Sequence, residues 1–117
     1  MSILGSADRL AAALAHLGMT IDTRAETGDA SASWTAKLLS KGVGACADKA
    51  EEEAGEFIQA LRNESDERVA SEAADMLYHA LVALRVRGVS LDDVAAALEK
   101  RQGTSGIAEK ASRGVPD

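Results

Sequence analysis

Four acidic residues have types and spacings that could bind a divalent cation. Glu53 and Glu56 are three residues apart, and so are Glu72 and Asp75. Residues three apart lie on one face of a helix, and four carboxylates gathered in one place repel one another unless a cation lies between them. Oxygen ligands favour Mg²⁺ or Mn²⁺ over Zn²⁺, which prefers Cys and His. A transition-metal site at Asp75 and His79 is the alternative, but the Glu-x-x-His pairs of di-iron bundles are absent.

Two long helices are predicted to carry these carboxylates, one at residues 45–62 and one at residues 66–87. The polar turn at residues 63–65 is so short that the two helices must be antiparallel neighbours. Each helix is expected to contact the other through an apolar seam, and its acidic stripe lies next to that seam in the same rotational direction. In an antiparallel pair, the two acidic stripes then lie on the same side and should converge. The seams contain Ala47, Ala50, Ala54, Phe57, Ile58 and Leu61 on the first helix and Val69, Ala73, Met76, Leu77, Ala80, Leu81 and Leu84 on the second.

The register of the two acidic stripes also matches, because equivalent residues lie equally far from the turn. Acidic residues on a helix usually mark a face that is exposed to solvent. On the second helix, however, Val82 and Val86 continue the acidic stripe, and valines are not expected on a solvent-exposed face. We therefore expect this helix to bury two sides and the chain to self-associate. The expected pairs are Glu56 with Glu72, Glu53 with Asp75, and Lys49 with His79.

Length and composition predict one all-α domain. The chain has 117 residues, of which 46% are hydrophobic, and its only proline is Pro116. The net charge of -6 argues against non-specific binding of nucleic acid. No apolar run reaches the roughly 20 residues that span a bilayer, and the first residues do not resemble a signal peptide. With a single cysteine, Cys46, the chain has no internal disulfide, and we expect a cytoplasmic protein.

The expected architecture is an antiparallel bundle of four to five helices, with the two long helices as its core and a homodimer completing it. Residues 1–101 would form the domain and residues 102–117 a mobile tail, because the tail is too polar to fold alone. The other expected elements are a helix at residues 6–17 that stops at Gly18, a polar loop at residues 20–33, a short helix at residues 34–40, and a last helix that opens with a capping box at Ser90 and ends near Arg101.

Several short motifs around the carboxylates resemble one known enzyme family. They are Glu-Glu-Ala-Gly-Glu at residues 52–56, Glu-Ala-Ala-Asp-Met-Leu-Tyr-His at residues 72–79, Ser-Trp-Thr-Ala-Lys-Leu at residues 33–38, Lys41-Gly42, and Lys49. The acidic motifs are similar to those of the all-α nucleotide pyrophosphohydrolases, and the whole set looks like the phosphoribosyl-ATP pyrophosphatases from Leu4 to Arg101. The chain departs from that family at Trp34, where tyrosine is usual, and at Ala50-Glu51, which replace a more typical Val-Gly pair. Neither departure removes a carboxylate.

The resemblance implies hydrolysis of phosphoribosyl-ATP to phosphoribosyl-AMP and pyrophosphate, an early step of histidine biosynthesis. Magnesium bridging the phosphates would neutralise developing charge and position a water molecule for in-line attack at the α–β anhydride. Under this hypothesis Glu52 orients or deprotonates the water, and its role could be exchanged with that of a ligand such as Glu53. The metal ligands would be Glu53, Glu56, Glu72 and Asp75.

A triphosphate also needs cations beyond the metal, so basic residues of this region are candidates to contact phosphate. They are Lys37, Lys41, Lys49 and Arg24. Two alternative functions stay open. One is a housekeeping nucleoside triphosphate pyrophosphohydrolase with the same metal site and a different base pocket. The other is a non-catalytic helical dimerisation module whose acidic face recruits a basic partner, and it predicts no dependence on metal.

Overall fold

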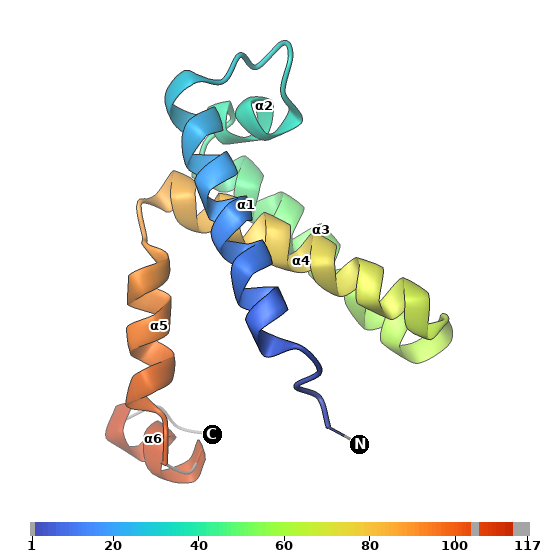
Figure 1. The fold of residues 1–117 in the computed structure, drawn as a ribbon, viewed down its shortest axis with the longest axis vertical. Coiled ribbons are helices and arrows are strands. Elements are labelled where there is room, and N and C mark those ends of the chain that lie inside the picture. The colour runs from blue at the N-terminus through green and yellow to red at the C-terminus, as the bar shows by residue number, and fades with distance from the viewer. Residues whose placement is uncertain (1, 104–105, 114–117) are drawn as a thin grey trace.

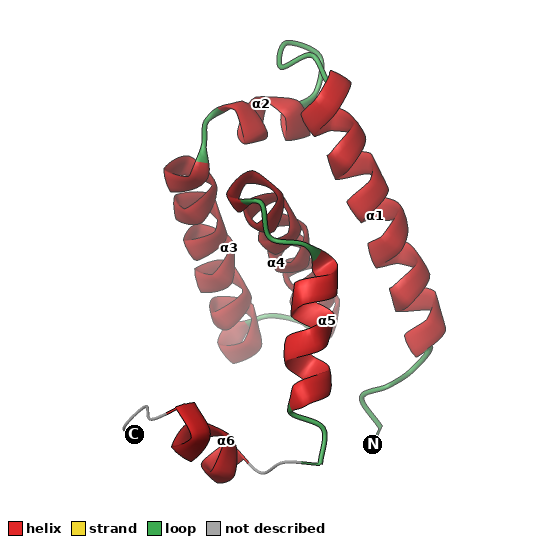
Figure 2. Ribbon diagram, turned by 90° about the vertical axis from the view of Figure 1, so that its left-hand side faces the viewer, coloured by secondary structure: helices red, strands yellow, loops and turns green. Residues whose placement is uncertain are grey.

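The structure, a computed structural model, describes residues 2–103 and 106–113 of the chain. These residues form helices and contain no strand, which confirms the predicted all-α class. The antiparallel hairpin of α3 and α4 is the most extensive contact between helices, and α1 packs against α4 (Figure 1). Figure 2 shows α2 bridging one end of the molecule between α1 and α3. The helices are α1 (Ala7–Thr27), α2 (Trp34–Ser40), α3 (Val43–Asn63), α4 (Asp66–Arg87), α5 (Leu91–Lys100) and α6 (Gly106–Arg113).

The ends of the hairpin helices follow signals that lie close by in the sequence. Ser65 caps the start of α4, because its Oγ accepts a hydrogen bond from the backbone N–H of Arg68 at 3.2 Å. The helix stops at Gly88, whose φ of 82° lies in the left-handed region that glycine adopts without strain. The bounds of α2 and α4 agree with the prediction, and α3 exceeds it slightly at both ends.

The first helix is longer than predicted: α1 does not stop at Gly18, and residues 20–27 are helical rather than part of a loop. Glycine inside a helix costs about 1 kcal/mol relative to alanine. Burial of Ile21, which is 2% exposed in the core, contributes about 1.5–3 kcal/mol and outweighs that cost. The Oγ1 atoms of Thr20 and Thr23 also donate to the carbonyl oxygens one turn earlier. Packing thus overrides the local stop signal.

The C-terminal part begins with a confirmed prediction and ends with an unexpected helix. Ser90 and Asp93 form the predicted capping box at the start of α5, which leaves the end of α4 and has no buried residue (Figure 1). In the expected tail, α6 adds a helix to the four to five that were predicted, and its Ile107 is largely exposed. Residues 104–105 and 114–117 of that tail lie outside the described residues. None of the described helices has the length and apolarity to span a bilayer.

The hydrophobic core lies where α1, α2 and the start of α3 meet the second half of α4. Its buried members are Ile21, Leu38, Cys46, Leu81 and Val82. Cys46 packs there as a small hydrophobic residue whose thiol donates to the carbonyl oxygen of Leu38 at 3.3 Å. The core therefore holds α2 and the start of α3 against α4, close to the part of the hairpin that carries the carboxylates.

The predicted apolar seams of α3 and α4 are covered only in part. Ile58, Leu61 and Leu77 of those seams are 46%, 56% and 36% exposed. The buried residues of the two helices include the carboxylates Glu53 of α3 and Glu72 of α4, which lie outside the predicted seams. Periodicity defines an apolar face but not the element that covers it, and here part of that face has no cover within the described chain.

Candidate metal centre

Three carboxylates from the two long helices meet at one place in the hairpin. Oxygen atoms of Glu53 and Glu56 from α3 and of Glu72 from α4 all lie within 4.8 Å of one another. Glu53 and Glu72 are 7% and 3% exposed, whereas Glu56 is exposed. The predicted convergence of the acidic stripes is therefore present, with Glu56 beside Glu72 as the register required. We call these three residues the acidic cluster.

The electrostatics of the acidic cluster favour the binding of a cation. A hydrogen bond with Glu53, followed by the charge of the same carboxylate, raises the pKa of Glu56 above its ordinary value. The buried Oε2 atom of Glu72 has no hydrogen-bond partner among the described residues. Buried acceptors are normally satisfied, and hard oxygen donors at this spacing suit Mg²⁺ or Mn²⁺. The residues present thus fit a divalent metal.

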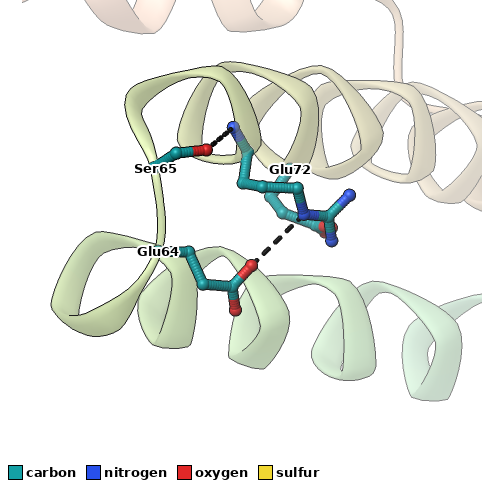
Figure 3. Close-up of polar contacts among 4 residues, drawn as sticks. Glu64, Ser65 and Glu72 are labelled. Carbon is teal, nitrogen blue, oxygen red and sulfur yellow. Dashed lines mark hydrogen bonds and ion pairs between the residues drawn. The ribbon is translucent and has the colours of Figure 1, made fainter.

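On the turn side of the acidic cluster, Arg68 supplies a counter-charge that the sequence analysis missed. Its Nη2 atom contacts Oε1 of Glu72, and its Nε donates to Oε1 of Glu64 at 3.2 Å. The side chains of this network lie at the closed end of the hairpin (Figure 3). Arg68 and Glu72 are four residues apart on one helix, and this i, i+4 spacing is the signal that could have revealed the pair.

Because the positive charge of Arg68 at Glu72 repels a cation bound to the same carboxylate, the Arg68→Gln variant should bind Mg²⁺ several-fold more tightly than the wild type. Isothermal titration calorimetry without nucleotide measures this affinity. Arg62→Gln is the matched control, since it removes the same charge from the last turn of α3 but no contact to Glu72. Weaker binding by Arg68→Gln would instead mean that Arg68 holds Glu72 in the geometry needed by the metal.

On its other side, the acidic cluster contacts Lys49 and His79. The Nζ atom of Lys49 lies 3.5 Å from Oε1 of Glu53 and 3.4 Å from Oε1 of Glu52. The Nε2 atom of His79 lies 3.8 Å from the same oxygen of Glu53. Burial lowers the pKa of His79, although the charge of Glu53 acts in the opposite direction. Lys49 and His79, which the register placed side by side, therefore meet at Glu53.

The other two predicted carboxylates lie at the edge of this arrangement. Asp75 is exposed and is not part of the acidic cluster, so the predicted pairing of Glu53 with Asp75 is not seen as a contact. Its charge nevertheless acts on His79, which places it near the same centre. Glu52 is exposed, and its carboxylate accepts a hydrogen bond from Lys49. Glu52 therefore stands beside the acidic cluster with a free approach from solvent.

The remaining predicted phosphate contacts are farther along the chain. Lys37 and Lys41 belong to α2 and its C-cap, and their Nζ atoms lie 5.9 Å and 5.6 Å from the centre of the Trp34 ring. Arg24 lies exposed in the last turn of α1 and makes no ion pair with the acidic cluster among the described residues. The structure thus brings Lys49 to the carboxylates and gathers Lys37 and Lys41 around Trp34.

Comparison with known proteins gives consistent matches over most of the chain. A model of the family described as phosphoribosyl-ATP pyrophosphohydrolase matches residues 14–102. A phosphoribosyl-ATP pyrophosphatase of Cereibacter sphaeroides is 55% identical over 102 residues, which cover 86% of this chain and 97% of the relative. Proteins with the same name from Rhodobacter capsulatus and Jannaschia sp. are 51% and 52% identical, covering 87% and 86% of this chain and 98% and 97% of the relatives.

Proposed function

The chain belongs to the phosphoribosyl-ATP pyrophosphohydrolase family, and on this premise we propose that it hydrolyses phosphoribosyl-ATP to phosphoribosyl-AMP and pyrophosphate in histidine biosynthesis. The observation that carries the proposal is the acidic cluster, where Glu53, Glu56 and Glu72 meet and a buried oxygen of Glu72 has no hydrogen-bond partner in the part of the chain that the structure describes. Water adds to phosphorus at the α–β anhydride, the bond to the bridging oxygen breaks, and pyrophosphate leaves. Cytoplasmic localisation stays a prediction.

The acidic cluster would hold Mg²⁺, or Mn²⁺ in its place, with Asp75 as a fourth ligand from the next turn of α4. When bound, the metal supplies charge neutralisation for the phosphates. Arg68, on the other oxygen of the Glu72 carboxylate, would place a positive charge beside the metal. The orphaned Oε2 atom of Glu72 supports this assignment, because a buried carboxylate oxygen without a donor is otherwise costly.

Glu52 is proposed to orient the attacking water or to take its proton, with Glu53 as the alternative base. Glu52 has the better access, because it is exposed and adjacent to Glu53, which is buried. Lys49 is proposed to contact the triphosphate, since it already lies beside Glu53 and its charge complements phosphate. Lys37, Lys41 and Arg24 are proposed as further contacts to phosphate.

A direct measurement of pyrophosphate release tests the function. The protein is incubated with phosphoribosyl-ATP, with and without Mg²⁺, beside a panel of ordinary nucleoside triphosphates. We expect fast release from phosphoribosyl-ATP only, and only with Mg²⁺. Release from ordinary triphosphates alone would favour a housekeeping nucleoside triphosphate pyrophosphohydrolase. No release from any nucleotide would favour the non-catalytic dimerisation module.

The hairpin also supports the proposal of a homodimer. Ile58 and Leu61 lie on one face of α3, and Leu77 lies on α4. All three are exposed, so apolar side chains of the hairpin have no cover within the described residues. A second copy of the same hairpin would bury this surface by packing as a four-helix bundle, the arrangement that two antiparallel pairs favour. The acidic cluster would then lie in the interior of the dimer's helical core.

The Leu61→Glu variant should sediment as a monomer under conditions in which the wild type sediments as a dimer, because a charge at this surface cannot be buried without a partner. Analytical ultracentrifugation at micromolar concentration gives the mass directly. Leu98→Glu is the matched control, since Leu98 is an exposed leucine of α5 outside the hairpin. A Leu61→Glu dimer, or dissociation of both variants, would contradict an interface through the hairpin.

A further inference from the structure

The most exposed aromatic feature of the molecule is Trp34 with two lysines around it. Trp34 is the only tryptophan of the chain and is 51% exposed. Trp34, Lys37 and Lys41 follow one face of α2 and its C-cap, and both Nζ atoms lie within 6 Å of the indole ring centre, at 5.9 Å and 5.6 Å. Both ammonium groups lie over the indole ring, so a ligand with a ring and an anionic group would draw the lysines to its anionic group and stack on the indole in their place.

The positive charge of this surface is available to a ligand. Neither Lys37 nor Lys41 forms an ion pair with a carboxylate within the described residues. Asp29, the acidic residue that precedes α2, uses its Oδ1 to accept hydrogen bonds from the backbone N–H and hydroxyl of Ser31. An open hollow lies beside the indole ring, lined in part by Ser31, Ser33 and Lys37. A phosphate in this hollow would meet the ammonium group of Lys37 and the hydroxyl of Ser33.

A continuous run of contacts connects this surface to the acidic cluster. Thr35, next to Trp34, shares a hydrogen bond of 2.6 Å with the Tyr78 hydroxyl. The Tyr78 ring packs edge-on against His79 with 4.8 Å between the ring centres, and Nε2 of His79 lies 3.8 Å from Glu53. These contacts link the surface around Trp34 to the acidic cluster through Thr35, Tyr78 and His79.

The substrate of the proposed function has the matching chemistry. Phosphoribosyl-ATP is an ATP whose base carries a second, phosphorylated ribose, so it has a triphosphate at one end, a purine in the middle and a single phosphate at the other end. The acidic cluster and Lys49 account only for the triphosphate. An ordinary nucleoside triphosphate lacks the second phosphate, and a cation site for that phosphate would distinguish the two substrates.

We propose, on the basis of the function proposed above, that Trp34 stacks on the purine and that Lys37 and Lys41 bind the phosphate of the phosphoribosyl group. Lys37 and Lys41 are thereby assigned to this distant phosphate and Lys49 to the triphosphate. Stacking on Trp34 holds the purine without reading its edges, and the lysines provide the discrimination against ATP. The face of α2 that carries Trp34 is then the specificity determinant of the enzyme.

Fluorescence of the single tryptophan tests this assignment directly. The full chain is titrated with phosphoribosyl-AMP, the product without the pyrophosphate, and in parallel with AMP, in EDTA and again with Mg²⁺. We expect saturable changes in Trp34 emission with both ligands, with phosphoribosyl-AMP binding at least about tenfold more tightly and equally well in EDTA. No change in emission, equal affinity for both ligands, or binding that requires Mg²⁺ would overturn the proposal.

Variants separate the roles of the ring and the lysines. The Lys37→Gln/Lys41→Gln double variant should bind phosphoribosyl-AMP no more tightly than AMP, whereas Lys100→Gln, which removes an exposed charge from α5, should keep the preference. Measured by calorimetry, the affinity of Trp34→Ala for both ligands should be about tenfold lower than that of the wild type. Trp34→Phe should retain most of the affinity. A double variant that still prefers phosphoribosyl-AMP would overturn the role of the lysines.

Failure of the proposed binding surface on α2 can be distinguished from failure of the proposed function. A protein that releases pyrophosphate from phosphoribosyl-ATP but shows no Trp34 response keeps the function and contradicts the assignment of α2. A protein that shows the expected responses of Trp34 and the lysine variants but releases no pyrophosphate keeps the binding surface and contradicts the function.

Discussion

Glu56→Gln is expected to reduce Mg²⁺-dependent pyrophosphate release by about a hundredfold or more while making the metal-free protein more resistant to heat. The loss follows because the variant removes a charged ligand from the metal that neutralises the phosphates. The gain follows because Glu53 and Glu72 repel the Glu56 carboxylate in the folded chain. Steady-state kinetics and thermal unfolding in EDTA measure the two effects.

The sign of the stability effect depends on the direction of the pKa shift. The pKa of Glu56 is raised in the folded state, so the folded chain holds the proton more tightly than the unfolded chain. Stability is therefore lost as the pH rises from the ordinary glutamate range through the raised pKa, and the full penalty is present above that pKa. A glutamine carries no charge and avoids this penalty.

The matched control for Glu56→Gln is Glu51→Gln, which removes an exposed carboxylate of α3 that is not part of the acidic cluster. It should keep both the activity and the unfolding temperature of the wild type. Excess Mg²⁺ should raise the unfolding temperature of the wild type and of Glu51→Gln but not that of Glu56→Gln. Full activity of Glu56→Gln would remove Glu56 from the metal site.

Ile21→Ala is expected to destabilise the fold by about 2–5 kcal/mol, the range for truncation of a buried isoleucine. Ile21 is fully enclosed by the core and ties the second half of α1 to α4. Met19→Ala is the control on the same helix, because Met19 is 66% exposed and its truncation leaves no cavity. Urea unfolding at fixed protein concentration measures both, since association with a second copy would add to the stability.

Equal effects of Ile21→Ala and Met19→Ala would contradict the packing of α1 beyond Gly18. Loss of stability in Ile21→Ala alone would show that this part of α1 is held by the core. The same comparison explains why the sequence predicted a loop here. Gly18 and the threonines that follow are weak helix formers, and only the contact of Ile21 with the core outweighs them.

Helix ends were predictable wherever the signal lies within a few residues. The side chain of Ser65, the left-handed glycine at Gly88 and the reciprocal hydrogen bonds of Ser90 and Asp93 stabilise helix ends that the sequence placed correctly. Each of these signals acts through the backbone next to it, so no knowledge of the rest of the fold is needed. The same holds for the short turn that forces α3 and α4 to be antiparallel.

The candidate site was predictable because it combines two local patterns with one geometric constraint. The three-residue spacings place carboxylates on one face of each helix, and the turn sets the register between the helices. That is sufficient to bring Glu56 beside Glu72. It does not determine that Glu53 contacts Lys49 and His79 while Asp75 lies outside the acidic cluster, because side-chain reach and small shifts of the helices decide such contacts.

By itself, then, the sequence determined the all-α class, the bounds of the hairpin and the convergence of its carboxylates, because periodicity and capping act over a few residues. Only the tertiary structure decided which faces are covered. In the structure, α1 continues past Gly18, Glu53 and Glu72 are buried, and Leu61 is exposed. The physical reason is that burial is a property of neighbours brought together by folding, and an apolar pattern on one helix does not specify which neighbour will cover it.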